Sequence, residues 1–322
     1  MVQKLSFSII IPVYNRPHEI AELLQSLQVQ DFEDDFEVIV VDDGSSQLSE
    51  KVSRDFMGIL NLKYFYKENT GPGLSRNYGM ERASGNYFII LDSDVIVPKN
   101  YLKIVNNALQ HHYVDAYGGP DAAADNFTPT QKAINYAMTS VFTTGGIRGK
   151  GQKMEKFHPR SFNMGLSKEV FKKTGGFSSM RYGEDIDLSI RIMQQGFQTA
   201  LLKDAFVYHK RRNDYRSFFK QVMHSGEARI LLNKLHPKSL KLVHWFPALF
   251  TIGFILGVIL WFFHIPHLLF LYIIYYVLLA IDASRQYHSI KLGLQSALAS
   301  FVMLLGYGTG FLKALWQSEK KN

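Results

Sequence analysis

Two short acidic clusters carry the side chains best suited to chemistry in this sequence. Asp92 and Asp94 follow the apolar run Tyr87–Leu91 with one residue between them. In extended backbone, residues i and i+2 point to the same side, so these carboxylates can share one cation. Oxygen ligands favour Mg²⁺ or Mn²⁺ over zinc, although a solvated turn also accommodates such a pair. Glu184 and Asp185 stand where a helix is predicted to begin, and carboxylates there act in catalysis or simply as helix caps.

Upstream of both clusters, a glycine-rich stretch from Asn69 to Gly79 contains one arginine, Arg76. Its spacing departs from G-x-G-x-x-G because Arg76 stands at the third glycine position, which disfavours a hydride-transferring dinucleotide enzyme. Two interpretations remain open. The stretch is either a glycine-permitted turn that presents Arg76 to phosphate, or an ordinary loop with a surface arginine.

The elements that must position these groups alternate between β-rich and amphipathic segments up to Asp94, which predicts βαβ units on a parallel sheet. The predicted strands are Phe7–Pro12, Phe36–Val41, Leu62–Tyr66 and Tyr87–Leu91. After the first strand, Asn15 is the predicted cap of a helix whose buried face is formed by Ile20, Leu23, Leu24 and Leu27. Because open parallel sheets bind ligands beyond the carboxyl ends of their strands, residues 13–16, 42–46 and 92–94 are expected at the site.

Composition sets the broad class. The 322 residues are 47% apolar and 20% charged, which excludes a disordered or collagen-like chain and allows about two domains. The net charge of +8 suits a partner with phosphates or an anionic membrane surface. The absence of cysteine excludes disulfides and cysteine-based zinc sites.

The last quarter of the chain is predicted to enter a membrane. Residues 245–263 and 265–281 lack charges and approach the length of a bilayer span, and 292–312 is a third candidate weakened by glycines. Buried core helices of a soluble protein are disfavoured because the first run has no polar face. Lysines and arginines flank the outer ends of the first two segments, which predicts that residues 1–212 lie in the cytoplasm. The chain is then expected to continue with a basic amphipathic linker (213–242), the membrane region (243–316) and a polar tail (317–322).

Five motifs in order give the chain a family resemblance. They are Ser8–Arg16, Val40–Ser45, Gly73–Gly79, Leu91–Asp94 and Gly183–Leu188. From about Phe7 to His209 the sequence resembles the family 2 glycosyltransferases, which are inverting enzymes with the GT-A fold, a Rossmann-like mixed α/β sheet that binds nucleotide sugars.

The resemblance implies a role for each residue at the matching positions. A nucleotide base and ribose would be surrounded by Pro12, Tyr14, Asn15, Arg16, Asp42 and Asp43. Arg76 would approach the diphosphate, Asp92 the nucleotide or the metal's water shell, and Asp94 would ligate Mn²⁺ or Mg²⁺. Asp185 matches the general base, Glu184 an acceptor contact, and His209 a further metal or diphosphate ligand.

We therefore expect a membrane-bound enzyme of the inner (cytoplasmic) membrane that moves a single sugar, with a UDP-sugar as the favoured donor, onto a lipid-linked glycan, and no nucleic-acid partner. A processive polysaccharide synthase is less well supported because no Gln-x-x-Arg-Trp motif occurs and the spans are few. A sugar nucleotidyltransferase and a non-catalytic sugar-nucleotide binding protein remain as alternatives. The segment Asp121–Pro159 contains no recognised motif and is expected to be an acceptor-side loop.

Overall fold

The computed structural model describes residues 4–122, 127–145 and 157–319, which fall into two compact units. The first unit comprises Met1–Ala124 and Lys153–His209, and the second comprises Asp125–Gln152 and Lys210–Asn322. The segment from 125 to 152 therefore interrupts the first unit in sequence but belongs with the C-terminal helices.

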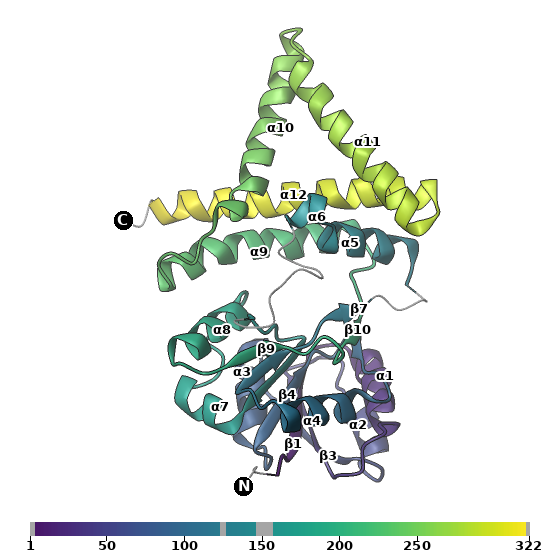
Figure 1. The fold of residues 1–322 in the computed structure, drawn as a ribbon, viewed down its shortest axis with the longest axis vertical. Helices are drawn as coiled ribbons and strands as arrows, with labels where there is room; N and C mark the ends of the chain where they lie inside the picture. Colours follow the sequence, from purple (N-terminus) through teal and green to yellow (C-terminus); the bar gives the residue numbers. More distant parts are fainter. Residues whose placement is uncertain (1–3, 123–126, 146–156, 320–322) are drawn as a thin grey trace. The chain divides into compact units, whose positions relative to one another are not determined.

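A seven-stranded sheet forms the centre of the first unit, with the order β3-β2-β1-β4-β8-β6-β9 (Figure 1). Its strands are β1 (Phe7–Val13), β2 (Glu37–Asp43), β3 (Asn61–Lys67), β4 (Tyr87–Leu91), β6 (Ala116–Gly118), β8 (Asn163–Ser167) and β9 (Thr199–Leu201). Strands β1 to β4 are parallel, whereas β8 is antiparallel to β4 and β6. The four predicted strands are thus confirmed to within two residues at each end, in a sheet that is mixed overall.

Helices pack on both faces of this sheet because successive residues of β1 point to opposite sides. The helices of the first unit are α1 (Pro17–Gln28), α2 (Glu50–Phe56), α3 (Pro72–Glu81), α4 (Tyr101–His111), α7 (Lys168–Thr174) and α8 (Glu184–Gln194). Ile9 and Ile11 lie in the core shared with α1 and α4, and Ile10 lies in the core shared with α3, α7 and α8. All three isoleucines are fully buried, at roughly 1.5–3 kcal/mol each, so β1 anchors both layers.

The loops at the carboxyl ends of the strands differ from two of the predictions. All four apolar residues predicted for the buried face of α1 are buried, but its N-cap is Arg16 and no side chain caps it. Asn15 instead has a φ of 54°, and its Oδ1 accepts hydrogen bonds from the backbone N–H groups of Ser46 and Gln47. The prediction of Asn15 as a helix cap is therefore wrong, because this side chain ties two loops together.

Most of the glycine-rich stretch, from Pro72 onward, is helical. Gly71, with a φ of 94°, turns the chain into α3, so Arg76 extends from the second turn of a helix. Gly79 faces β1 so closely that a Cβ would lie 2.7 Å from Ile10 Cγ2. The interpretation as an ordinary loop with a surface arginine is therefore wrong, because Arg76 is buried in a helix. The turn permitted by Gly71 is present, and the presentation of Arg76 to phosphate stays a prediction.

A second, smaller sheet joins distant parts of the first unit in the order β5-β10-β7. Its strands are β5 (Val95–Ile96), β7 (Asp121–Ala122) and β10 (Val207–His209). Because β10 is antiparallel to β5, His209 lies opposite Val95. The neighbouring strands β9 and β10 thus lie in different sheets.

The second unit is helical. It contains α5 (Pro129–Thr139), α6 (Val141–Thr144), α9 (Tyr215–Leu235), α10 (Phe246–Phe262), α11 (His267–Tyr287) and α12 (Ile290–Glu319). Three helices, Leu242–Phe262, His267–Tyr287 and Ile290–Glu319, are long and apolar enough to cross a membrane. The Tyr272 hydroxyl donates to the Phe250 carbonyl oxygen (2.7 Å), which joins α10 and α11 as a hairpin.

The expectation of a loop over Asp121–Pro159 is wrong for residues 129–144. The side chain of Thr128, just before this segment, accepts a hydrogen bond from the Gln131 N–H, and the Gln131 side chain accepts one from the Thr128 N–H. The two bonds form a capping box that starts α5. The Thr-x-x-Gln pattern was a readable helix signal. Most of the glycine run that follows, within residues 146–156, lies outside the described residues.

Candidate active site

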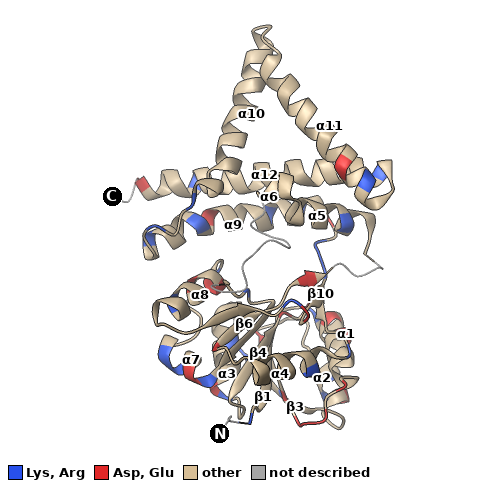
Figure 2. Ribbon diagram, in the orientation of Figure 1, with Lys and Arg blue, Asp and Glu red and all other residues tan. Residues whose placement is uncertain are grey.

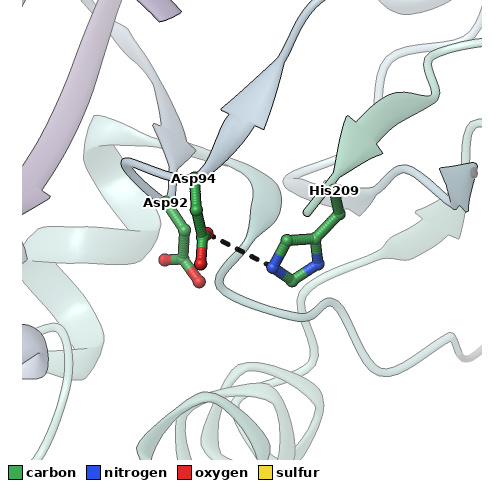
Figure 3. A group of neighbouring side chains, drawn as sticks. All are labelled: Asp92, Asp94 and His209. Carbon is green, nitrogen blue, oxygen red and sulfur yellow. Dashed lines mark ion pairs between the residues drawn. The ribbon is translucent and has the colours of Figure 1, made fainter. Parts of the chain in front are cut away.

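Three potential metal ligands meet just beyond the carboxyl end of β4 (Figure 3). Ligand atoms of Asp92, Asp94 and His209 all lie within 4.8 Å of one another. The two aspartates lie in the turn between β4 and β5, where the Val95 N–H donates to the Asp92 carbonyl oxygen (3.3 Å). The predicted convergence of these carboxylates is present, but a turn produces it rather than extended backbone. The pairing of β10 with β5 adds the imidazole.

The donor set fits a divalent cation. Carboxylate oxygens suit Mg²⁺ and Mn²⁺, and an imidazole nitrogen shifts the preference toward the transition metal, Mn²⁺. His209 Nε2 lies 3.3 Å from Asp94 Oδ1, and the Phe162 ring stacks on the imidazole at 5.0 Å between centroids. Asp121 Oδ2 lies 4.0 Å from the other ring nitrogen, Nδ1, which has no hydrogen-bond partner within the described part of the chain. These contacts orient the ring with Nε2 toward Asp94 and Nδ1 toward Asp121.

Arg16 is the cationic neighbour of this cluster. Its Nη1 lies 2.6 Å from Asp94 Oδ2, so both oxygens of Asp94 have a partner. Burial alone would raise the pKa of Asp94, but His209 and Arg16 hold that pKa well below its ordinary value. Asp94 is therefore ionised throughout the neutral range, as a metal ligand must be.

Arg76 connects the metal cluster, defined as the candidate ligands Asp92, Asp94 and His209, with the acidic start of α8. Its side chain is buried, with Nη2 2.7 Å from Asp92 Oδ1 and Nη1 3.0 Å from Glu184 Oε1. The guanidinium also lies over the Phe177 ring at 5.1 Å. Burial raises the pKa of Glu184, Arg76 opposes that rise, and the neighbouring Asp185 adds to it. The predicted approach of Arg76 to a diphosphate stays a prediction. In this arrangement both of its Nη atoms are bound to carboxylates.

Asp185, the predicted general base, lies in the first turn of α8. Gly183, with a φ of 83°, precedes the helix. Asp185 Oδ1 accepts a hydrogen bond from the Ile186 N–H (2.8 Å), and Oδ2 lies 3.5 Å from Arg160 Nε. No sequence signal pointed to Arg160, because it lies outside every motif and reaches Asp185 only through the fold.

The predicted nucleotide residues of β2 serve as acceptors inside the loops. The buried carboxylate of Asp42 accepts hydrogen bonds from Ser49 N–H (3.0 Å) and the Tyr64 hydroxyl (2.8 Å). Asp43 accepts hydrogen bonds from Gly71 N–H (2.9 Å) and from Lys67. Asp43 therefore holds the turn that starts α3, and a direct contact of either aspartate with a nucleotide stays a prediction.

The remaining predicted nucleotide residues follow β1. Pro12 is buried within the strand, whereas the Tyr14 side chain just beyond it is 52% exposed. An exposed aromatic ring beside the carboxyl edge of a sheet is free to stack on a base. The structure thus brings Asp92, Asp94, His209, Arg16, Arg76 and Glu184 into one linked set of contacts, with Asp185 next to Glu184 in sequence. Asp42 and Asp43 lie buried beneath the surrounding loops.

Comparisons with known proteins place the chain in a family. Residues 8–175 match Glycosyl transferase family 2. The Staphylococcus aureus poly(ribitol-phosphate) beta-N-acetylglucosaminyltransferase TarS is 38% identical over 114 residues, which are 34% of this chain and 20% of TarS. This chain therefore matches only a fifth of the length of that relative.

Solved structures resemble most of the chain. TarS 1-349 in complex with UDP-GlcNAc covers 98% of this chain and 92% of its own, with a TM-score of 0.52 and 18% identity. Mannosyltransferase PcManGT from Pyrobaculum calidifontis, in complex with GDP-Man and Mn²⁺, covers 98% of this chain and 88% of its own, with a TM-score of 0.61 and 16% identity. At these identities the likeness concerns the fold.

Together, the mixed sheet and the acidic cluster beyond β4 define the class of GT-A glycosyltransferases. The family match covers more than half of the 322 residues. The chain belongs to glycosyl transferase family 2.

Proposed function

We propose that this protein is a metal-dependent inverting glycosyltransferase that moves one sugar from a nucleotide-diphospho-sugar to an acceptor at the membrane. The observation that carries the proposal is the Arg76 bridge between Asp92 and Glu184, because it joins the metal cluster to the helix that begins with Glu184 and Asp185. A transferase of this kind needs a charge-neutralising centre for the leaving group and a base for the acceptor within one site.

The cation is assigned to Asp92, Asp94 and His209, and when bound it would neutralise the departing nucleoside diphosphate. Asp185 is the proposed base. It removes the proton of the acceptor hydroxyl while that oxygen bonds to the anomeric carbon and the bond from that carbon to the diphosphate oxygen breaks. Attack from the face opposite the leaving group inverts the configuration. Arg160, at 3.5 Å from Asp185 Oδ2, orients the carboxylate.

The donor is proposed to be a UDP-sugar with Mn²⁺. TarS bound UDP-GlcNAc, and PcManGT bound GDP-Man with Mn²⁺. The exposed ring of Tyr14 is the proposed stacking surface for the base, and Pro12, Asn15, Asp42 and Asp43 shape the loops around it. Once a diphosphate enters, Arg16 and Arg76 are the two arginines adjoining the metal cluster that can approach it.

The acceptor is proposed to be a lipid-linked glycan at the inner membrane. The hairpin of α10 and α11 would cross the bilayer, with residues 1–212 as the cytoplasmic catalytic domain and 213–242 as a basic linker at the membrane surface. Supporting this, the three candidate membrane helices follow the proposed site residues in sequence, with α9 between His209 and the first of these helices. An acceptor carried on a membrane lipid would remain near such an anchored enzyme.

The test is Asp185→Asn in the full chain, assayed with a panel of UDP-, GDP- and dTDP-sugars and a membrane extract as acceptor. We expect transfer to fall about 10²- to 10⁴-fold, the range of general-base catalysis, with nucleotide binding retained. The matched control is Asp55→Asn, at an exposed position of α2, which should leave the rate unchanged. Wild-type turnover in Asp185→Asn would refute the base assignment, and NMR of the product's anomeric centre would establish inversion or retention.

A further inference from the structure

The third apolar helix, α12, runs alongside α9 for most of its length. The Tyr215 hydroxyl at the start of α9 donates to the Gln295 carbonyl oxygen (3.4 Å), and twelve residues later Glu227 binds Lys313 (2.7 Å). Between these contacts, Gly226 approaches the α12 backbone so closely that a Cβ would collide with it. The two helices therefore run side by side in the same direction. Their shared length extends from about Gln295 to Lys313 of α12 and contains most of its apolar residues.

Helix α9 is too highly charged to accompany α12 through hydrocarbon. Along the shared length it carries Arg216, Lys220, Glu227 and Arg229, whereas the α10–α11 hairpin has no charged residue before Asp282 (Figure 2). Each Lys or Arg at the centre of a bilayer costs about 2.5–3.5 kcal/mol. A membrane crossing by α12 would take these charges with it or would require breaking the α9–α12 contacts.

On another side, α12 supports the two ends of the hairpin. Gly308 packs on Pro247 in the first turn of α10, and Gly293 packs on Ala280 near the end of α11. These two contacts are fifteen residues apart, or roughly 22 Å along a helix. Phe301, between them, touches both Phe254 and Tyr276. α12 thus joins the diverging ends of α10 and α11, and the rest of the hairpin extends away from it (Figure 1).

We infer that α12 lies along the membrane surface, with α9 on its aqueous side and the hairpin on its lipid side, and that it does not form a third span. The inference rests on the proposed membrane location. Both ends of α12 are then on the same side of the bilayer. The interaction surface for lipid is the hairpin together with the face of α12 from which it extends.

The absence of cysteine makes the sidedness directly measurable. Single substitutions Lys51→Cys, Gln286→Cys and Gln317→Cys introduce thiols at exposed positions of α2, the end of α11 and the end of α12. A membrane-impermeant maleimide is applied to sealed vesicles of either orientation. We expect all three variants to be labelled from the same side. Labelling of Gln317→Cys from the side opposite Gln286→Cys would overturn the inference.

A fourth variant separates this inference from the proposed function. His264→Cys lies in the link between α10 and α11. Labelling of this variant from the opposite side supports two crossings. If it is not labelled from that side, the proposed crossing fails while the position of α12 is still decided by the other variants. If the protein does not sediment with membranes, the membrane location fails and the inference fails with it.

Depth gives an independent measurement on exposed aliphatic side chains. Leu298 lies in the first half of α12 at 50% exposure, and Ile274 lies in the first half of α11 at 56% exposure. Nitroxide labels at Leu298→Cys and Ile274→Cys, relaxed by oxygen and by a water-soluble nickel complex, report their depth in a bilayer. A surface α12 predicts a shallow label at 298 and a deep label at 274. Equal depth at the two positions would contradict the inference.

Discussion

Replacing Arg76 with methionine tests whether this residue holds the site together or serves only a nucleotide. The side chain is 3% exposed and its Nη atoms bind Asp92 and Glu184, whose side chains are 29% and 9% exposed. Removing the cation leaves a buried carboxylate without its partner, which costs about 3–5 kcal/mol for a fully buried pair. Because the partly exposed Asp92 can bind water instead, we expect the free energy of unfolding to fall by about 3 kcal/mol, the lower end of that range.

The Arg76→Met variant should be measured by hydrogen exchange of β4 in the full chain. A loss near 3 kcal/mol corresponds to more than a hundredfold lower protection. Tryptophan fluorescence would not report it, because Trp245, Trp261 and Trp316 all lie in the second unit. The matched control is Arg82→Met at the C-cap of the same helix, where the guanidinium lies over the Tyr78 ring and the loss should stay below about 1 kcal/mol.

The double variant gives the sharper test. Combining Arg76→Met with Glu184→Gln removes the carboxylate charge that Arg76→Met leaves unpaired. The double variant should therefore be about 1–3 kcal/mol more stable than the summed losses of the two single variants predict. Additive losses, or normal protection of β4 in Arg76→Met together with lost nucleotide binding, would refute the bridging role. The second outcome would support the role predicted from sequence, a direct contact with the diphosphate.

Three further outcomes follow from contacts in the first unit. Because the pKa of Asp94 lies below its ordinary value of about 3.9, its contacts stabilise the fold fully above about pH 4, and their contribution is lost as the pH falls through the folded-state pKa. In metal-free protein, the stability difference between wild type and Asp94→Asn should therefore narrow from pH 6 to pH 3 in thermal unfolding, and a constant difference would contradict this account. Arg16→Gln removes the cation that competes for Asp94 Oδ2, so Mn²⁺ should bind roughly tenfold more tightly in the absence of nucleotide, a gain of about 1.4 kcal/mol, as measured by EPR of the free ion. Unchanged or weaker Mn²⁺ binding would show that Arg16 does not compete. Gly79→Ala should destabilise by about 1–3 kcal/mol because its Cβ meets the buried Ile10, whereas Gly58→Ala, with open space around it, should be neutral in the same denaturation assay.

Local sequence patterns were sufficient to predict those strands and helices whose apolar residues recur at short, regular spacing in the chain. Alternation and apolar runs predicted the four parallel strands, and the spacing of Ile20, Leu23 and Leu27 predicted the buried face of α1. The motif order also identified the family, now established by the match over residues 8–175. These features depend on backbone periodicity, which is written in consecutive residues.

Tertiary structure decided which of these residues meet. The antiparallel pairing of β10 with β5 brings His209 to Asp94 across more than a hundred residues, and no local pattern encodes that register. The same applies to Arg160 at Asp185 and to the Arg76 bridge, which depends on a helix where glycines suggested a loop. The sequence by itself determined which side chains could bind a metal and a proton. Only the packing of β10, α3 and α8 around the end of β4 decided that His209, Arg76 and Glu184 lie beside the two aspartates, because contacts between distant segments depend on the whole fold.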